Sequence, residues 1–197
     1  MIYILSIDQS TSGTKALLFD ERGILIGRSD LPHEQKVSLN GWVAQDPMEI
    51  YRNTIQVVRN VLAKTGIDKN KIISVGISNQ RETAIVWDRD TGLPVHDAVV
   101  WQCSRGKAIC ERLNHSGFAE QVQSKTGLRL SPYFSAAKIA WVLENTGSLA
   151  GKHLCAGTMD SWLIFKLTGG KVFRTDYSNA SRTQLFNITE LKWDTSL

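Results

Sequence analysis

The chain has 197 residues, of which 42% are hydrophobic, and this is enough apolar content to bury a sizeable core. Its net charge of +4 comes from 23 basic and 19 acidic residues that are spread along the sequence, so we do not expect it to bind nucleic acid. No stretch of about 18 apolar residues predicts insertion into a membrane, and the N-terminus lacks the pattern of a signal peptide. The three cysteines, Cys103, Cys110 and Cys155, have neither zinc-ligand spacing nor the pattern of a disulfide framework, which favours a cytoplasmic location.

The first half of the chain predicts a small antiparallel sheet followed by a helix. Strands are expected at residues 2–7, 15–19 and 24–28, with an acid-and-glycine turn at residues 20–23 between the second and the third. Asp46 is typical of a helix N-cap, with Pro47 at the first helical position and Glu49 three residues after the cap. Gly66 is expected to end this helix.

The rest of the chain alternates apolar strands with helical patterns and shows no internal repeat or linker, so we predict no domain boundary. This order indicates an α/β fold, with a mixed sheet whose first three strands are antiparallel and with helices on both faces. The remaining tryptophans, Trp42, Trp87, Trp141 and Trp162, are assigned to the core. Further strands are expected at residues 72–77, 84–88 and 98–101, and helices at residues 107–113, 137–145 and 159–167.

Small polar residues follow the first strand, in the sequence LSIDQSTSGTK that runs from Leu5 to Lys15. A tight turn rich in Ser, Thr and Gly exposes backbone N–H groups and hydroxyls to one anion, and Gly13 permits close approach or a positive φ. Lys15 adds a positive charge that suits a phosphate, and Asp8 suits a direct or water-mediated contact to Mg²⁺. Neither the P-loop pattern nor the dinucleotide-binding glycine pattern is present, and an ordinary polar hairpin turn is the alternative.

Arg81 and Glu82 lie just after the apolar strand at residues 72–77, where open α/β sheets place ligand-binding groups. Glu82 can accept hydrogen bonds from hydroxyls while Arg81 donates to their oxygens, so the pair can hold a diol from both sides. A surface ion pair is the alternative interpretation.

Several segments together resemble one family of enzymes. The hairpin sequence DQSTSGTK is similar to the first phosphate loop of the actin-like ATPase superfamily, and NQRET and TDYSNASRT are more specific than such a loop. The segments that resemble the FGGY family of carbohydrate kinases, above all its glycerol-phosphorylating members, are residues 41–51, 76–106, 126–145, 157–172 and 175–188.

The resemblance implies an RNase H-like, actin-like ATPase fold and the ATP-dependent phosphorylation of glycerol to glycerol 3-phosphate, with ATP and Mg²⁺ as cofactors. It places the phosphates of ATP near Thr11, Ser12, Gly13 and Lys15, and it gives Asp8 the positioning of Mg²⁺ and phosphate. Ser10 replaces the first glycine of the usual glycerol-phosphorylating loop, and Lys15 replaces an arginine, so the tightness of nucleotide contact there stays open.

For the acceptor, the resemblance implies that glycerol or a similar small polyol contacts Arg81, Glu82 and Tyr133. It also implies that the carbon backbone of the polyol packs against Trp101. An aromatic wall with a few convergent polar groups is typical of a site for a small polyol.

Members of the family continue well beyond the region that this sequence matches. We therefore expect residues 1–197 to be an incomplete N-terminal, polyol-binding domain that is inactive alone, with the general-base aspartate and the C-terminal ATPase-like domain outside it. Homo-oligomerisation of the full-length protein is left open.

Other functions stay open at this point. One is a kinase of the same family that acts on a different polyol or on a keto-sugar, and another is a non-catalytic polyol-binding remnant. A serine hydrolase is disfavoured because no G-x-S-x-G elbow with a partner histidine occurs.

Overall fold

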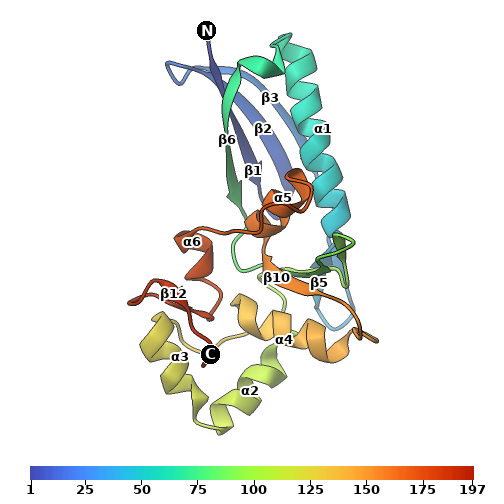
Figure 1. The fold of residues 1–197 in the computed structure, drawn as a ribbon. Helices are drawn as coiled ribbons and strands as arrows, with labels where there is room; N and C mark the ends of the chain where they lie inside the picture. The colour runs from blue at the N-terminus through green and yellow to red at the C-terminus, as the bar shows by residue number, and fades with distance from the viewer. The chain divides into compact units, whose positions relative to one another are not determined.

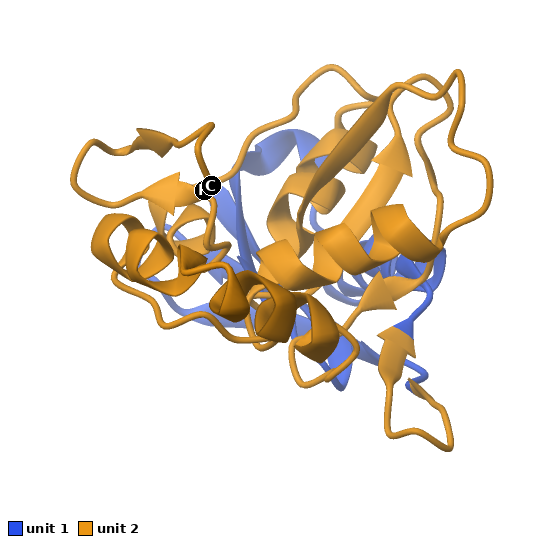
Figure 2. Ribbon diagram, turned by 90° about the horizontal axis from the view of Figure 1, so that it is seen from below, with its two compact units in different colours: residues 1–35, 45–80 blue, residues 36–44, 81–197 orange.

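The computed structural model describes residues 1–197, which form two compact units (Figure 2). The first unit contains residues 1–35 and 45–80, and the second contains residues 36–44 and 81–197. The sequence analysis predicted no boundary inside the chain. The chain crosses from one unit to the other at residues 35/36, 44/45 and 80/81, and none of these places is a Gly- or Pro-rich linker, so composition did not reveal the crossings.

The first unit is built on a four-stranded sheet in the order β3-β2-β1-β6. Strands β1 and β2 pair antiparallel, as do β2 and β3, which confirms the predicted meander. The fourth strand, β6, pairs parallel with β1 and makes the sheet mixed. The strands span Tyr3–Gln9 (β1), Gly13–Asp20 (β2), Leu25–Pro32 (β3) and Ile72–Asn79 (β6).

Helix α1 (Pro47–Thr65) runs along this sheet and packs on β2 and β3 (Figure 1). The carboxylate of Asp46 caps its first turn by accepting from the Met48 N–H at 2.8 Å, and Gly66 ends it with φ 67°. Both ends therefore agree with the prediction. Val57 and Val61 of the helix are fully buried against Leu18 and its neighbours in the sheet.

The opposite face of the same sheet carries exposed apolar side chains. Alternate residues of a strand point to opposite faces, so the buried Leu5 faces α1 while Ile4 faces the other way. The exposed Ile4 and Leu25 lie on this opposite face, where both are register partners of Phe19. In the first unit, helix α1 thus covers one face of the sheet, and the predicted second helical layer is not present there.

The second unit has its own sheet, with the strand order β10-β7-β9-β5-β4 and with β8 paired to β7. Its central strand, β7, is buried along its whole length and pairs antiparallel with β10, β8 and β9. The strands span Lys36–Val37 (β4), Val43–Gln45 (β5), Ala84–Asp88 (β7), Leu93–Pro94 (β8), Ala98–Val99 (β9) and Leu154–Thr158 (β10).

Helices cover both faces of this second sheet, as the sequence predicted. Helix α4 (Ser135–Asn145) places Val142 against Val86 of β7. Helix α5 (Met159–Leu167) packs against the next residue of the strand, Trp87, whose ring centroid lies 5.4 Å from that of Trp162. Because neighbouring residues of a strand face opposite ways, α4 and α5 lie on opposite faces.

Shorter elements complete the second unit. Helix α2 was predicted, whereas α3, α6 and the hairpin of β11 and β12 were not. A one-turn 3-10 helix, Lys69–Lys71, belongs to the first unit and precedes β6. The other elements span Lys107–His115 (α2), Phe118–Thr126 (α3), Tyr177–Ala180 (α6), Phe186–Asn187 (β11) and Lys192–Trp193 (β12).

All three cysteines are free and buried. No helix of the chain combines the length and the apolar character that crossing a membrane would need.

Candidate functional site

The predicted phosphate-binding turn joins β1 to β2 in the first unit. Ser10 closes the turn, because its backbone N–H and its hydroxyl both donate to the Gly13 carbonyl at 2.9 Å. Its hydroxyl also lies 3.3 Å from that of Ser12. The turn therefore presents a group of small polar side chains, which is the composition that a phosphate needs.

Gly13 is required because β2 and β3 approach each other closely at this residue, and not because its φ is positive. A Cβ atom at this position would lie 2.5 Å from the carbonyl oxygen of Leu31 on β3. Of the two reasons given for this glycine in the sequence analysis, the structure supports close approach, here between two backbones.

Hydrogen bonds from elsewhere in the first unit hold the turn in place. Gln45 donates through Nε2 to the Thr11 carbonyl at 2.7 Å, and Gln80 donates to Oε1 of Gln45 at 2.8 Å. Thr11 donates to Oε1 of Gln80 at 3.3 Å, and the N–H of His33 donates to the Ser12 carbonyl at 3.0 Å. Preorganised donors stabilise charge without reorganising when a ligand binds.

His33 is a buried anchor of this region. Its Nδ1 accepts from the side-chain amide of Asn53 at 3.1 Å, because the same amide group also donates to the Pro32 carbonyl. This assigns the proton to Nε2, which lies 2.8 Å from the Thr14 hydroxyl. Burial lowers the pKa of His33 to about 4, so the ring is neutral near pH 7.

Asp8 and Lys15 are cross-strand partners at the open end of the hairpin. The Lys15 ammonium lies 2.9 Å from Oδ2 of Asp8, and both side chains are about one-third exposed. The Ser78 hydroxyl lies 3.4 Å from Oδ1. The predicted metal-positioning acid and the predicted phosphate-binding cation are thus neighbours.

Asp8 fits a metal ion that arrives with a nucleotide. No cluster of three or more His, Cys, Asp or Glu side chains in the chain could hold a metal by itself. Mg²⁺ is commonly bound through one or two carboxylates together with substrate phosphates, and a single carboxylate beside a phosphate-binding turn matches that donor set.

The second unit contains all four predicted polyol-binding residues. Glu82 is 4% exposed and has a φ of 61°, which is unusual for a residue other than glycine. Its carbonyl accepts from the Ser135 hydroxyl at 3.1 Å, and a tight turn brings the Thr83 N–H to the Arg81 carbonyl at 2.7 Å. A buried carboxylate on a strained backbone is typical of a functional site.

Trp101 and Tyr133 form an aromatic wall in the same unit. Their ring centroids are 5.6 Å apart in an edge-to-face arrangement, and Tyr133 stacks in the same manner on Phe134. The Trp101 N–H donates to the Thr83 hydroxyl at 3.1 Å, which ties the wall to the residue after Glu82.

Arg182 connects the carboxylate to the aromatic wall. Its Nε donates to Oε1 of Glu82 at 2.6 Å, and its guanidinium lies 4.9 Å from the Phe134 ring centroid and 5.9 Å from that of Tyr133. The sequence alone indicated no role for Arg182. Its position in TDYSNASRT, one of the specific segments, was the available signal, but the contact spans 100 residues and no local pattern reveals it.

Arg81 lies outside these contacts. Its side chain is exposed, in contrast to that of Glu82. Arg182, and not Arg81, is therefore the cation that pairs with the carboxylate. The structure brings together Glu82, Trp101 and Tyr133 of the four predicted polyol residues.

Lys138 supports Tyr133 from within the core. Its fully buried Nζ donates to the carbonyls of Pro132 at 2.7 Å and Phe134 at 3.0 Å, and also to that of Tyr133. Burial lowers the pKa of Lys138 to about 7. Its hydrogen bonds fix the backbone turn that presents the Tyr133 ring.

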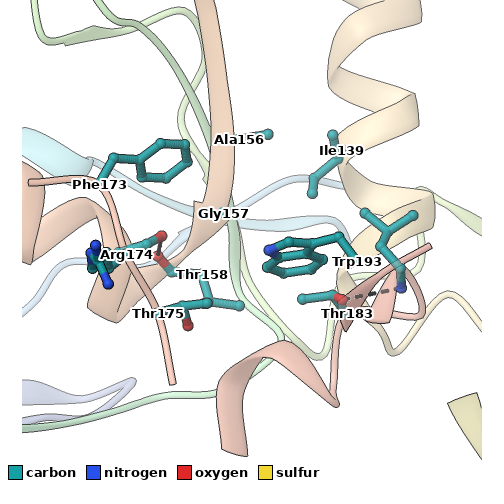
Figure 3. Close-up of a pocket in the computed structure, with 11 residues that line it drawn as sticks. Ile139, Ala156, Gly157, Thr158, Phe173, Arg174, Thr175, Thr183 and Trp193 are labelled. Atoms are coloured by element: carbon teal, nitrogen blue, oxygen red, sulfur yellow. Dashed lines mark hydrogen bonds between the residues drawn. The ribbon is translucent and has the colours of Figure 1, made fainter. Parts of the chain in front are cut away.

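A cavity of about 310 Å³ also lies in the second unit, with a mostly apolar lining (Figure 3). Figure 3 shows Phe173 and Trp193 on opposite sides of it. The hydroxyls of Thr158 and Thr175 both donate to the buried carboxylate of Asp160, at 2.5 and 2.6 Å, and burial raises the pKa of that carboxyl group. None of the predicted polyol residues lines this cavity, so we assign it no part in the reaction.

Comparison with known families gives one match over nearly the whole chain. A model described as the N-terminal domain of the FGGY family of carbohydrate kinases matches residues 3–197.

Curated relatives are similar at high identity. Glycerol kinase 1 of Thermotoga maritima is 50% identical over 197 residues, which cover 98% of this chain and 40% of that protein. A glycerol kinase of Fusobacterium nucleatum is 48% identical over 199 residues, with 98% and 40% covered. The chain thus spans about 40% of the length of these relatives.

Solved structures share the fold. A Plasmodium falciparum glycerol kinase with ADP matches with a TM-score of 0.90 and 39% identity, over 100% of this chain and 40% of that one. A ligand-bound xylulose kinase from Lactobacillus acidophilus matches with a TM-score of 0.88 over 100% of this chain and 39% of that one. Its identity is 24%, so this second likeness concerns the fold alone.

Proposed function

The chain belongs to the FGGY family of carbohydrate kinases, and from this premise we propose that the protein transfers the γ-phosphoryl group of ATP to glycerol and forms glycerol 3-phosphate. One structural observation carries the proposal. A buried carboxylate, Glu82, accepts a hydrogen bond from Nε of Arg182 beside an aromatic wall. Two relatives named glycerol kinase, at 48% and 50% identity, support the choice of acceptor.

The polyol site works through complementary polar and apolar contacts. Oε1 of Glu82 is taken by Arg182, which leaves Oε2 to accept from a hydroxyl of glycerol. Trp101 and Tyr133 supply an apolar surface for the carbon backbone, and the phenol of Tyr133 adds a polar tip. Arg81, exposed in the structure, is proposed to swing onto a substrate oxygen when polyol is present.

The β1–β2 turn is proposed to bind the phosphates of ATP. Thr11, Ser12 and Gly13 offer hydroxyls and backbone amides, and Lys15 offers a charge. Asp8 would hold Mg²⁺ that arrives with the nucleotide, and a bound Mg²⁺ neutralises the charge that develops on the transferred group.

These residues are proposed to contribute to the reaction by positioning the two substrates. Phosphoryl transfer depends mainly on holding acceptor and donor in line and on stabilising charge, so fixed contacts to each substrate supply much of the rate. The general base is not assigned to a residue of this chain. A cytoplasmic location stays a prediction.

A coupled assay tests the proposal. The protein that carries this chain should form ADP in the presence of glycerol, ATP and Mg²⁺, with a higher kcat/KM for glycerol than for xylulose or gluconate. An Asp8→Ala variant controls for a contaminating kinase. Preference for xylulose or gluconate would instead assign the protein to another branch of the family, and binding of polyol without turnover would favour a non-catalytic role.

A further inference from the structure

We propose that Arg182 is a positioning residue of the polyol site, which orients the Glu82 carboxylate and couples it to the Tyr133 wall. This inference rests on the proposed function, because it concerns the same site. Arg182 is not among the residues that the sequence assigned to the polyol.

The contact between Arg182 and Glu82 is short and largely shielded from water. Nε of Arg182 lies 2.6 Å from Oε1, and the Glu82 side chain is only 5% exposed. A charge-assisted hydrogen bond of this length is among the stronger contacts available to a carboxylate. Taking Arg182 away would leave the buried carboxylate without its hydrogen-bonded cation, which is costly.

Arg182 is also packed in place by aromatic rings. Its guanidinium lies 4.9 Å from the Phe134 ring centroid and 5.9 Å from that of Tyr133. A planar guanidinium can stack on a ring and donate in its own plane at the same time, which a lysine ammonium cannot do. One side chain therefore fixes the relative positions of the acid and of the aromatic wall.

The backbone on both sides of the contact is anchored independently. On one side, Ser135 donates to the Glu82 carbonyl at 3.1 Å. On the other side, the Arg182 N–H donates to the Asn179 carbonyl at 3.0 Å, and the Ala136 N–H donates to the Thr183 carbonyl at 2.9 Å. The backbone hydrogen bonds thus hold the two segments in place. The contact between the Arg182 and Glu82 side chains sets the orientation of the carboxylate oxygens.

Lys138 interacts electrostatically with Glu82 but makes no hydrogen bond to its carboxylate. The hydrogen bonds of Lys138 go to three backbone carbonyls, and the Arg81 side chain is exposed. Because Arg182 is hydrogen-bonded to Oε1, the orientation of Oε2 is fixed as well. The affinity for a polyol hydroxyl depends on this orientation.

Titration of glycerol into the protein that carries this chain tests the inference, with binding read from the ¹H–¹⁵N NMR signal of the Trp101 indole N–H. A Trp101→Phe variant identifies this signal, because the signal is absent from its spectrum. Arg182→Ala is expected to raise the dissociation constant for glycerol at least about 10-fold, the size of a lost charge-assisted hydrogen bond. The dissociation constant of Arg182→Lys should lie between those of Arg182→Ala and wild type, because lysine keeps the positive charge and loses the planar guanidinium group.

Chemical rescue separates positioning from a general structural role. Guanidinium chloride at a concentration far below that of denaturation should restore part of the glycerol affinity of Arg182→Ala, while the same concentration of KCl should not. Arg112→Ala is the matched control, because Arg112 makes an ion pair of the same 2.6 Å length with Glu144 on the exposed surface of the same unit. Its glycerol affinity should equal that of wild type.

The outcomes are distinct. If the wild-type Trp101 signal does not respond to glycerol or to any other polyol, the proposed function fails, and the inference fails with it. If wild type responds and Arg182→Ala binds equally well, or if guanidinium restores nothing, the inference alone is overturned. Should Arg182→Ala not fold, Arg182→Lys decides the question, and wild-type affinity in that variant would refute it.

Discussion

Lys15 and Asp8 face each other across the β1–β2 hairpin, and the ammonium of Lys15 lies 2.9 Å from the carboxylate of Asp8. Both side chains are about one-third exposed, so the pair is screened by water and contributes little to folding. The pair lies at the mouth of the polar turn, where it is placed for a role in binding rather than in folding. Lys15 holds the carboxylate beside the turn that is proposed to bind the phosphates of ATP.

Asp8→Asn should therefore affect activity far more than stability. We expect the free energy of unfolding to change by less than about 1 kcal/mol, because the ion pair is exposed. Phosphotransfer should fall on the order of 10²-fold or more, because the metal-bound phosphates lose their position. Thermal melts and initial rates check this, with Asp30→Asn as the control, since Asp30 makes an exposed ion pair with Arg28 on β3. Unchanged rates in Asp8→Asn would remove Asp8 from the site.

Gly13→Ala should destabilise the first unit. The added Cβ would lie 2.5 Å from the Leu31 carbonyl oxygen, so β2 and β3 must move apart, at a cost of about 1–3 kcal/mol. Gly76→Ala on β6 is the matched control, because a Cβ there meets nothing within 4 Å. Chemical denaturation measures both variants. Equal midpoints for the two would mean that the strand contact does not constrain Gly13.

The stability of the protein should fall in mild acid because of His33. Its pKa is about 4 in the folded state and near 6.5 when unfolded, so the unfolded state binds more protons between these values. The contribution is fully present above pH 6.5 and is lost as pH falls toward 4, by up to about 3 kcal/mol.

The difference between two denaturation series measures this contribution. The free energy of unfolding of wild type minus that of His33→Gln should rise with pH between about 4 and 6.5. If the difference in free energy of unfolding does not change with pH, protonation of the His33 ring costs the folded state nothing.

Much of the fold could be predicted because its signals are local. The caps of α1 illustrate this, since Asp46 and Gly66 act within one turn of the helix ends, and the meander follows from three apolar runs separated by turn residues. Strand β10 and helix α3 were missed for the opposite reason. The β10 sequence LCAGT lacks the alternation of a typical strand and has only one β-branched residue, Thr158, and it forms a strand through its pairing with β7.

The candidate site was predictable in its residue types and not in its pairing. Glu82, Trp101 and Tyr133 were assigned from their chemistry and from the family resemblance, and they do lie together in the second unit. The partner of Glu82 was expected to be its neighbour Arg81. The positive φ of Glu82 turns its side chain inward while Arg81 stays exposed, and only tertiary folding brings Arg182 to the carboxylate.

The glycerol dependence of the rate in Glu82→Gln tests the central claim, that the buried carboxylate belongs to the acceptor site of a glycerol-phosphorylating kinase. Initial rates should be measured on the protein that carries this chain, with glycerol varied at saturating ATP and then ATP varied at saturating glycerol. The matched control is Glu144→Gln, which removes an exposed carboxylate that pairs with Arg112 at the same 2.6 Å. We predict that Glu82→Gln raises the KM for glycerol at least about 10-fold and leaves the KM for ATP unchanged, while Glu144→Gln changes neither. A wild-type KM for glycerol in Glu82→Gln would contradict the assignment of this site.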